Sequence, residues 1–180
     1  MKPIEIVAQV LGIVAMALNI YSYQGKKKST VIGFQLFGGA LFAANFLLLG
    51  AVVGSVMNMI AVIRAVVFLF KDKFKADKPL CFILFLIAYV TVYVLSFTLW
   101  GKEPTPWNFI IELLPVIGMA SLHIGFMLKK ASDVRKCALV ASPAWLIYNF
   151  VAGSWGGTLC EVFSLCSVLV GMLRHDRKKV

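Results

Sequence analysis

The sequence predicts an all-α membrane protein in which seven transmembrane helices form two parallel three-helix bundles joined by a linker helix. Three observations support this: the composition, the number of apolar runs and the distribution of basic residues. Of the 180 residues, 61% are hydrophobic and 14% are charged, whereas soluble domains average about 45–50% apolar and about 25% charged residues. Since a spanning helix needs roughly 20 apolar residues, seven spans leave no room for a separate soluble domain.

Polar breaks divide the chain into seven candidate spans, which are 4–23, 31–50, 52–70, 79–100, 106–128, 137–153 and 156–173. The first is interpreted as a retained helix, because its lysine triplet at 26–28 follows the apolar run, whereas a signal peptide carries its positive charge before it. Only the stretch from Gly50 to Gly54 separates the second span from the third. Six spans with one long bent helix is therefore the competing count, although a run twice the length of one span favours a tight turn.

The basic residues support seven spans. With that count, 15 of the 18 lysines and arginines fall on one side of the membrane, in clusters at 26–28, 71–78, 129–136 and 174–179. Short loops rich in lysine and arginine remain cytoplasmic, so the N-terminus is predicted outside and the C-terminus inside. This sorting explains the net charge of +10 without nucleic acid as a partner.

An internal repeat relates the two ends of the chain. The segment NFLLLGAVVGSVMNMI (45–60) aligns with NFVAGSWGGTLCEVF (149–163) when one gap is allowed. The matched pairs are Asn45 with Asn149, Phe46 with Phe150, Gly54 with Gly157 and Asn58 with Glu161. The repeat divides the chain into a first three-helix repeat (1–70), a basic loop with a linker helix (71–104) and a second three-helix repeat with a basic cytoplasmic tail (105–180).

Two such repeats joined by one extra span share one orientation, as in one class of transporters. The glycines around 50–54 and 153–157 are interpreted as turn and close-packing positions.

Three polar residues are predicted at one depth within the membrane. At 1.5 Å per helical residue, Asn58, Glu112 and Glu161 each lie roughly 9 Å below the outer surface. Ionisable residues inside a membrane suggest function, but a carboxyl group can also act as hydrogen-bonding glue between helices. If the two glutamates approach each other they would titrate as a pair, and such a pair could carry a proton with a substrate. Arg64 is predicted to extend its side chain toward the cytoplasmic surface.

Further candidates lie on neighbouring spans. Asn45, Trp145 and Asn149 complete the predicted substrate pathway with Asn58, Glu112 and Glu161. Trp145 could stack on a ligand or simply pack, and His123 is interpreted as a hydrogen-bonding group between helices. Pro115 and Pro143 lie inside predicted helices and permit bends, and Gly12 and Gly39 stand at the matching places of the first repeat. Paired bends suit a rocking transporter and a kinked bundle equally well.

No pattern of catalytic or metal-binding residues is evident. The four cysteines have no CxxC spacing, and the two histidines, His123 and His175, lie far apart in the sequence. No serine, cysteine or histidine is arranged as a nucleophile with its base. We therefore expect no enzymatic activity, no metal and no cofactor.

The segments ELLPVIG (112–118), NFVAGSWGGTLCE (149–161) and FLLLGAVVGSVMNMIAVIR (46–64) resemble the YgjV family of bacterial inner-membrane proteins over nearly the whole chain. The resemblance implies an inner-membrane location and no particular substrate. More distantly, the arrangement of three, one and three spans is similar to the SWEET and PQ-loop superfamily, whose members carry small metabolites. That resemblance implies an asparagine in each of spans 3 and 7 and an aromatic residue in span 6. Asn58 and Trp145 match, whereas Glu161 departs and favours a cationic or proton-coupled substrate.

The sequence thus predicts a small-metabolite transporter or facilitator, with the lipid bilayer and an unidentified small molecule as its partners. The alternative is a membrane interaction or receptor protein in which the carboxylates hold helices together. A cavity around Glu112 and Glu161 would support transport, and a dry helix seam would support the alternative. Assembly into a homo-oligomer is left open.

Overall fold

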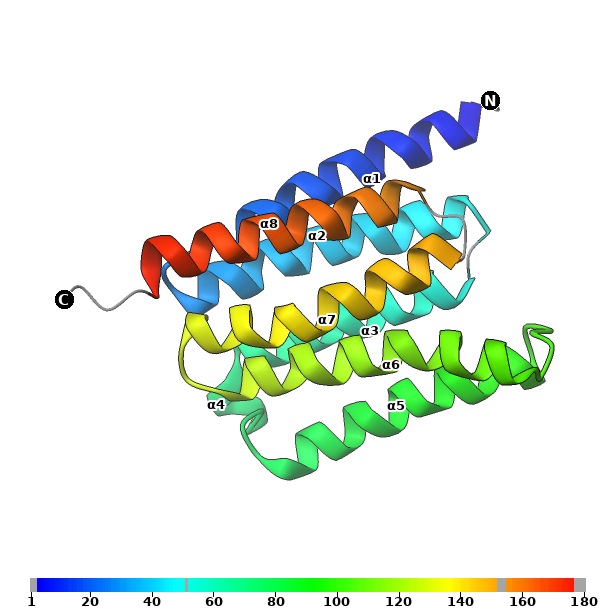
Figure 1. Cartoon of the computed structure of the whole chain (residues 1–180). Coiled ribbons are helices and arrows are strands. Elements are labelled where there is room, and N and C mark those ends of the chain that lie inside the picture. Colours follow the sequence, from blue (N-terminus) through cyan, green and yellow to red (C-terminus); the bar gives the residue numbers. More distant parts are fainter. Residues whose placement is uncertain (1–2, 51, 152–154, 177–180) are drawn as a thin grey trace.

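The computed structural model describes residues 3–50, 52–151 and 155–176, with the side chain of Trp155 excepted. Within these ranges the regular secondary structure is all helical, without strands. The helices are α1 (Pro3–Ser22), α2 (Lys28–Leu48), α3 (Val52–Leu69), α4 (Lys71–Phe74), α5 (Pro79–Thr98), α6 (Pro106–Met127), α7 (Ala131–Val151) and α8 (Trp155–His175). All but α4 are long helices, and they lie alongside one another in one bundle (Figure 1).

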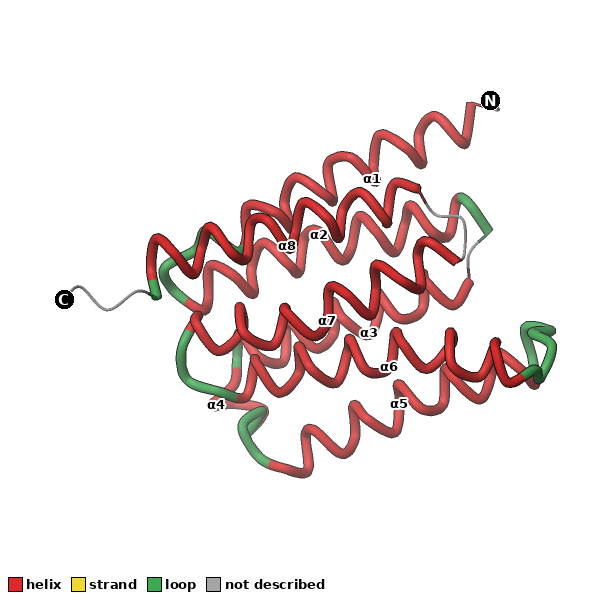
Figure 2. Tube along the Cα trace, viewed as in Figure 1, coloured by secondary structure: helices red, strands yellow, loops and turns green. Residues whose placement is uncertain are grey.

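The long helices form two layers of three, with α5 at one edge. In one layer α2 packs between α1 and α3, and in the other α7 packs between α6 and α8. The layers meet where α1 packs on α8, α2 contacts α7 and α3 packs on α6, while α5 packs on α3 and α6. The loops gather at the two ends of the bundle, and the termini lie at opposite ends (Figure 2).

Six of the long helices have the length and apolar composition needed to cross a membrane. They are α1, α2, α3, α5 and α6 with the bounds given above, and Gly156–His175 within α8. The remaining long helix, α7, has 21 residues. It is not among the six, because the charged residues Asp133, Arg135 and Lys136 near its start lower its hydropathy. The structure therefore supports a helical protein that crosses the membrane several times.

The predicted boundaries are close to the observed ones except at α7, which begins six residues earlier than expected. The charged residues at 133–136 suggested a loop. Instead, Arg135 is buried, and its Nε and Nη2 donate to the carboxylate of Asp176 at 2.9 and 2.5 Å. Its Nη1 donates to the carbonyl oxygen of Gly25 at 3.0 Å. Because these partners neutralise and satisfy the guanidinium group, the helix continues through Arg135 and joins α8 to the α1–α2 connection.

The glycines near the two inter-helix turns do different things. Gly50 has a φ of 75°, as a tight turn requires. Gly54 and Gly157 instead lie inside helices and allow close approach: a Cβ at Gly157 would lie 2.7 Å from the Asn149 side chain, and one at Gly54 would lie 3.1 Å from the Phe46 ring. For these two positions the packing interpretation holds and the turn interpretation does not. Gly153, also predicted in a turn, lies outside the described residues.

Candidate functional site: a polar cavity between the helix layers

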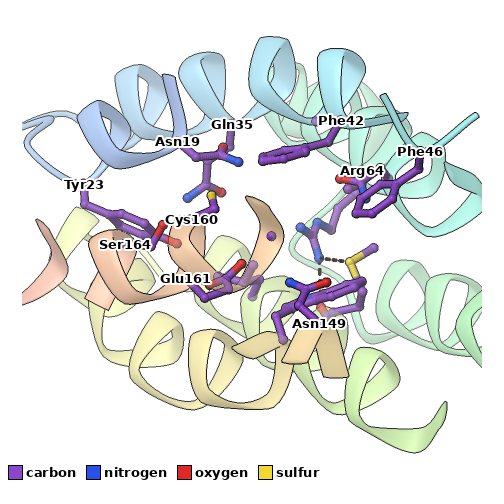
Figure 3. Close-up of a pocket in the computed structure, with 17 residues that line it drawn as sticks. Asn19, Tyr23, Gln35, Phe42, Phe46, Arg64, Asn149, Cys160, Glu161 and Ser164 are labelled. Atoms are coloured by element: carbon purple, nitrogen blue, oxygen red, sulfur yellow. Dashed lines mark hydrogen bonds between the residues drawn. The ribbon is translucent and has the colours of Figure 1, made fainter. Parts of the chain in front are cut away.

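A cavity of about 100 Å³ lies between the two helix layers. Every helix of both layers contributes to its wall: α1, α2 and α3 from one side, and α6, α7 and α8 from the other. A space of this size has room for a small molecule. Figure 3 shows the side chains that line it.

Glu161 of α8 lies on the cavity wall. The hydroxyl groups of Ser142 and Tyr23 are among its polar neighbours. Within the described part of the chain, Glu161 takes part in no ion pair. An unpaired carboxyl group in a membrane interior is costly, so its place on a cavity wall requires either a proton or a ligand.

Arg64 of α3 also lines the cavity, and here the sequence-based expectation is wrong. Its side chain does not extend to the bundle end but is 3% exposed. Its Nη1 donates to the carbonyl oxygen of Met119 on α6 at 2.8 Å, and its guanidinium carbon lies 5.0 Å from the centre of the Phe126 ring. The side chain turns inward because a backbone acceptor and an aromatic face are available on the neighbouring helix.

Three of the other predicted pathway residues line the same cavity: Asn58, Trp145 and Asn149. Asn58 donates its amide group to the carbonyl oxygen of Gly54, one turn earlier in α3, at 2.8 Å. Trp145 packs against Gly118 of α6, where an added Cβ would lie 2.7 Å from the indole nitrogen. Trp145 therefore has a packing role in addition to its place on the cavity wall.

Two predicted pathway residues lie elsewhere. Glu112 is 2% exposed and is not among the cavity-lining residues; its Oε1 lies 2.8 Å from Nζ of Lys102, in the α5–α6 connection. Asn45 donates to the carbonyl oxygen of Ala8 at 2.6 Å and fastens α2 to α1. The predicted glutamate pair thus divides between two places, one in a helix seam and one on a cavity.

The four predicted bend positions all lie within continuous helices: Gly12 in α1, Gly39 in α2, Pro115 in α6 and Pro143 in α7. Gly12 faces the Asn45 side chain, where an added Cβ would lie 3.1 Å from the amide nitrogen. Gly39 lines the cavity. Bending at these positions remains a prediction.

His123 is fully buried, as an inter-helix group would be. Its Nδ1 lies 3.4 Å from the hydroxyl oxygen of Tyr89 on α5, and three phenylalanine rings surround the imidazole with centroid distances of 5.0–5.3 Å. Among the described residues there is no group of three or more histidine, cysteine or acidic side chains that could hold a metal ion.

The sequence-based reasoning missed several polar residues on the cavity wall. They are Asn19, Tyr23, Gln35, Arg64 and Ser164. Asn19 and Gln35 carried a usable signal, because each is a lone amide in an apolar run. Arg64 carried the same signal, but its position near a span end favoured the surface.

Comparison with known protein families gives a match. The family Imp-YgjV, described as bacterial inner membrane protein, matches residues 6–179 of this chain. Neither the curated proteins nor the solved structures give a match.

Proposed function

Since the chain belongs to the YgjV family of bacterial inner membrane proteins, we propose that it carries a small metabolite across that membrane through the cavity between its helix layers. The observation that carries this proposal is the cavity itself, which six helices line and which has Glu161 on its wall. Ligand sites in transporters lie between helix repeats near the middle of the membrane. A carboxyl group that only held helices together would need no such space beside it.

The packing supports an internal repeat of three helices. If α1, α2 and α3 are exchanged with α6, α7 and α8, the contacts are preserved: α1 with α8 becomes α6 with α3, and α2 with α7 is unchanged. In this interpretation α5 is the linker helix. Two equivalent halves around one cavity suit alternating access, in which the halves rock about a central site.

In the proposed topology α7 also crosses the membrane, as the sixth of seven spans. It packs between α6 and α8 and contacts α2, and its Arg135, Ser142 and Asn149 side chains are buried away from lipid. All the lysine-rich connections then lie on the cytoplasmic side, with the N-terminus outside and the C-terminus inside.

Proton coupling is part of the proposal. Because low polarity favours the neutral carboxyl form, Glu161 is the group that would take up a proton in one state and release it in another. Uptake into liposomes should then depend on the proton gradient across the membrane and lose that dependence in Glu161→Gln. Uptake by the wild type that does not change with the gradient would contradict coupling.

A second candidate function is a membrane interaction or receptor protein. The Lys102–Glu112 pair favours it, because this carboxylate lies at a helix seam. A thermal-shift screen of sugars, amino acids, polyamines and vitamins, on wild type and Glu161→Gln, separates the two. A ligand that stabilises only the wild type supports transport. No stabilising ligand, together with a clear loss of stability in the variant, supports the interaction protein.

A further inference from the structure

We propose that the ligand of the cavity is a small zwitterion, whose carboxylate binds Arg64 and whose ammonium group binds Glu161. This inference rests on the proposed transport function and names its substrate class. It is drawn from two charged residues that share a cavity without pairing with each other.

Arg64 is a buried charged residue on the cavity wall. It is 3% exposed. Its Nη1 has acceptors in the Met119 carbonyl oxygen at 2.8 Å and the Tyr89 hydroxyl at 3.4 Å. Its Nε is buried and has no hydrogen-bond partner among the described residues. No carboxylate in the described part of the chain forms an ion pair with it. A buried guanidinium group without a counterion is costly, so a partner from outside the chain would relieve it.

Arg135 is the other buried arginine among the described residues. Arg135 directs Nη1 at a backbone carbonyl oxygen and offers its Nε and Nη2 edge to both oxygens of Asp176, at 2.9 and 2.5 Å. Arg64 has the equivalent Nη1 contact with a carbonyl oxygen, but no carboxylate on Nε. Since that edge of a guanidinium group matches a carboxylate in two parallel hydrogen bonds, the group that Arg64 lacks is a carboxylate.

Glu161 is the acidic residue on the cavity wall. It lines the same cavity from α8, the helix diagonally opposite α3 in the two layers. In Figure 3 the Arg64 and Glu161 side chains approach the cavity from different sides. No lysine or arginine pairs with Glu161 among the described residues. The complement of its ionised form is a cation, and an ammonium group can donate to its carboxylate and to the hydroxyl of Ser142 nearby.

The two charges together select against other ligands. A simple anion would satisfy Arg64 but lie near Glu161, and a simple cation would meet the reverse problem. A neutral molecule would leave both charges buried without a partner. Such unfavourable pairings are a source of specificity. The cavity volume of about 100 Å³ suits a small ligand.

The test uses four probes of similar size that differ in charge: glycine (a zwitterion), ethanolamine (a cation), glycolate (an anion) and ethylene glycol (neutral). Thermal shift is measured on the purified full-length protein in detergent, and uptake of each labelled probe is measured in liposomes. We expect glycine to stabilise the protein and to enter the liposomes, with the other three weaker by about tenfold or more. β-Alanine and γ-aminobutyrate are longer zwitterions. Comparing their binding with that of glycine shows which separation of ammonium and carboxylate groups matches the separation of Glu161 and Arg64.

Two variants make the test specific. Glu161→Gln is expected to bind glycine about tenfold or more weakly than the wild type does. Its affinity for glycolate should rise relative to its affinity for glycine. Arg64→Gln is expected to shift preference toward ethanolamine. A merely structural role would change stability without exchanging the preferred charge. If Arg64→Gln does not fold, the change of charge preference in Glu161→Gln tests the zwitterion proposal by itself.

The outcomes separate the two proposals. Binding of a zwitterion without uptake supports the ligand class and contradicts transport. Binding and uptake of only a cation, an anion or the neutral probe overturns the zwitterion and leaves transport standing. No binding of any of the probes, the longer zwitterions included, overturns the ligand class, as does an unchanged charge preference in a folded variant.

Discussion

Lys102 and Glu112 form an ion pair, with 2.8 Å between Nζ and Oε1, that links the α5–α6 connection to the buried side of α6. The lysine is 45% exposed and the glutamate 2%, and Tyr148 of α7 lies beside the carboxylate. Glu161 has no such partner among the described residues and lies on the cavity wall. We therefore expect that removing the Glu112 carboxylate affects mainly stability, and that removing the Glu161 carboxylate affects mainly ligand binding.

Glu112→Gln is expected to lower the free energy of unfolding by about 1 kcal/mol, because the half-exposed lysine weakens what the ion pair contributes. The response to glycine in the thermal-shift assay should be unchanged. Glu161→Gln is its matched control, with little loss of stability and no response to glycine. Equal loss of the ligand response in both variants would show that the two carboxylates act together.

Asp176→Asn is expected to destabilise the protein by up to about 3 kcal/mol, because it leaves the Arg135 guanidinium group buried without its counterion. Asp72→Asn is the control, since it makes the same chemical change at an exposed position of α4. Thermal unfolding in detergent, followed by circular dichroism, measures both. Similar melting temperatures for the two variants would mean that the Arg135–Asp176 pair contributes little.

Gly157→Ala is expected to cost about 1–3 kcal/mol and to weaken glycine binding, because the added methyl group would lie 2.7 Å from the Asn149 side chain on the cavity wall. Gly33→Ala in α2 is the control, where no atom lies within 4 Å of the added carbon. That change should stabilise by up to about 1 kcal/mol through helix propensity. A Gly157→Ala protein that binds as well as wild type would exclude close packing at this position.

Cysteine labelling tests the topology. Glu103 and Lys130 are exposed residues in the connections before and after α6. With seven spans, a membrane-impermeant maleimide added to intact cells should label Glu103→Cys once the outer membrane is permeabilised, and should not label Lys130→Cys. The unsubstituted chain, with its free native cysteines, gives the background. A fluorescent protein that matures only in the cytoplasm should fluoresce when fused to the C-terminus, and a dark fusion would contradict seven spans.

The long helices were predictable because each is a continuous apolar run bounded by charge, proline or glycine. Pro79 and Pro106 begin α5 and α6 as expected, since proline is tolerated in a first helical turn. The start of α7 was not predictable in this way. Arg135 counts as a loop residue by hydropathy, and its burial depends on Asp176, which is 41 residues away.

By itself, the sequence determined the class of protein, the approximate helix boundaries and the gathering of basic residues in alternate connections, because these follow from composition and order along the chain. Tertiary structure alone decided which polar residues meet. Asn58, Glu112 and Glu161 were predicted at one depth, but depth does not fix the direction in which a helix face points. Packing of α6 turned Glu112 to Lys102, and packing of α3 against α6 brought Arg64 to the cavity that Glu161 lines. The rotation of each helix about its own axis depends on its neighbours, and that rotation places one carboxylate beside Lys102 and the other on the cavity wall.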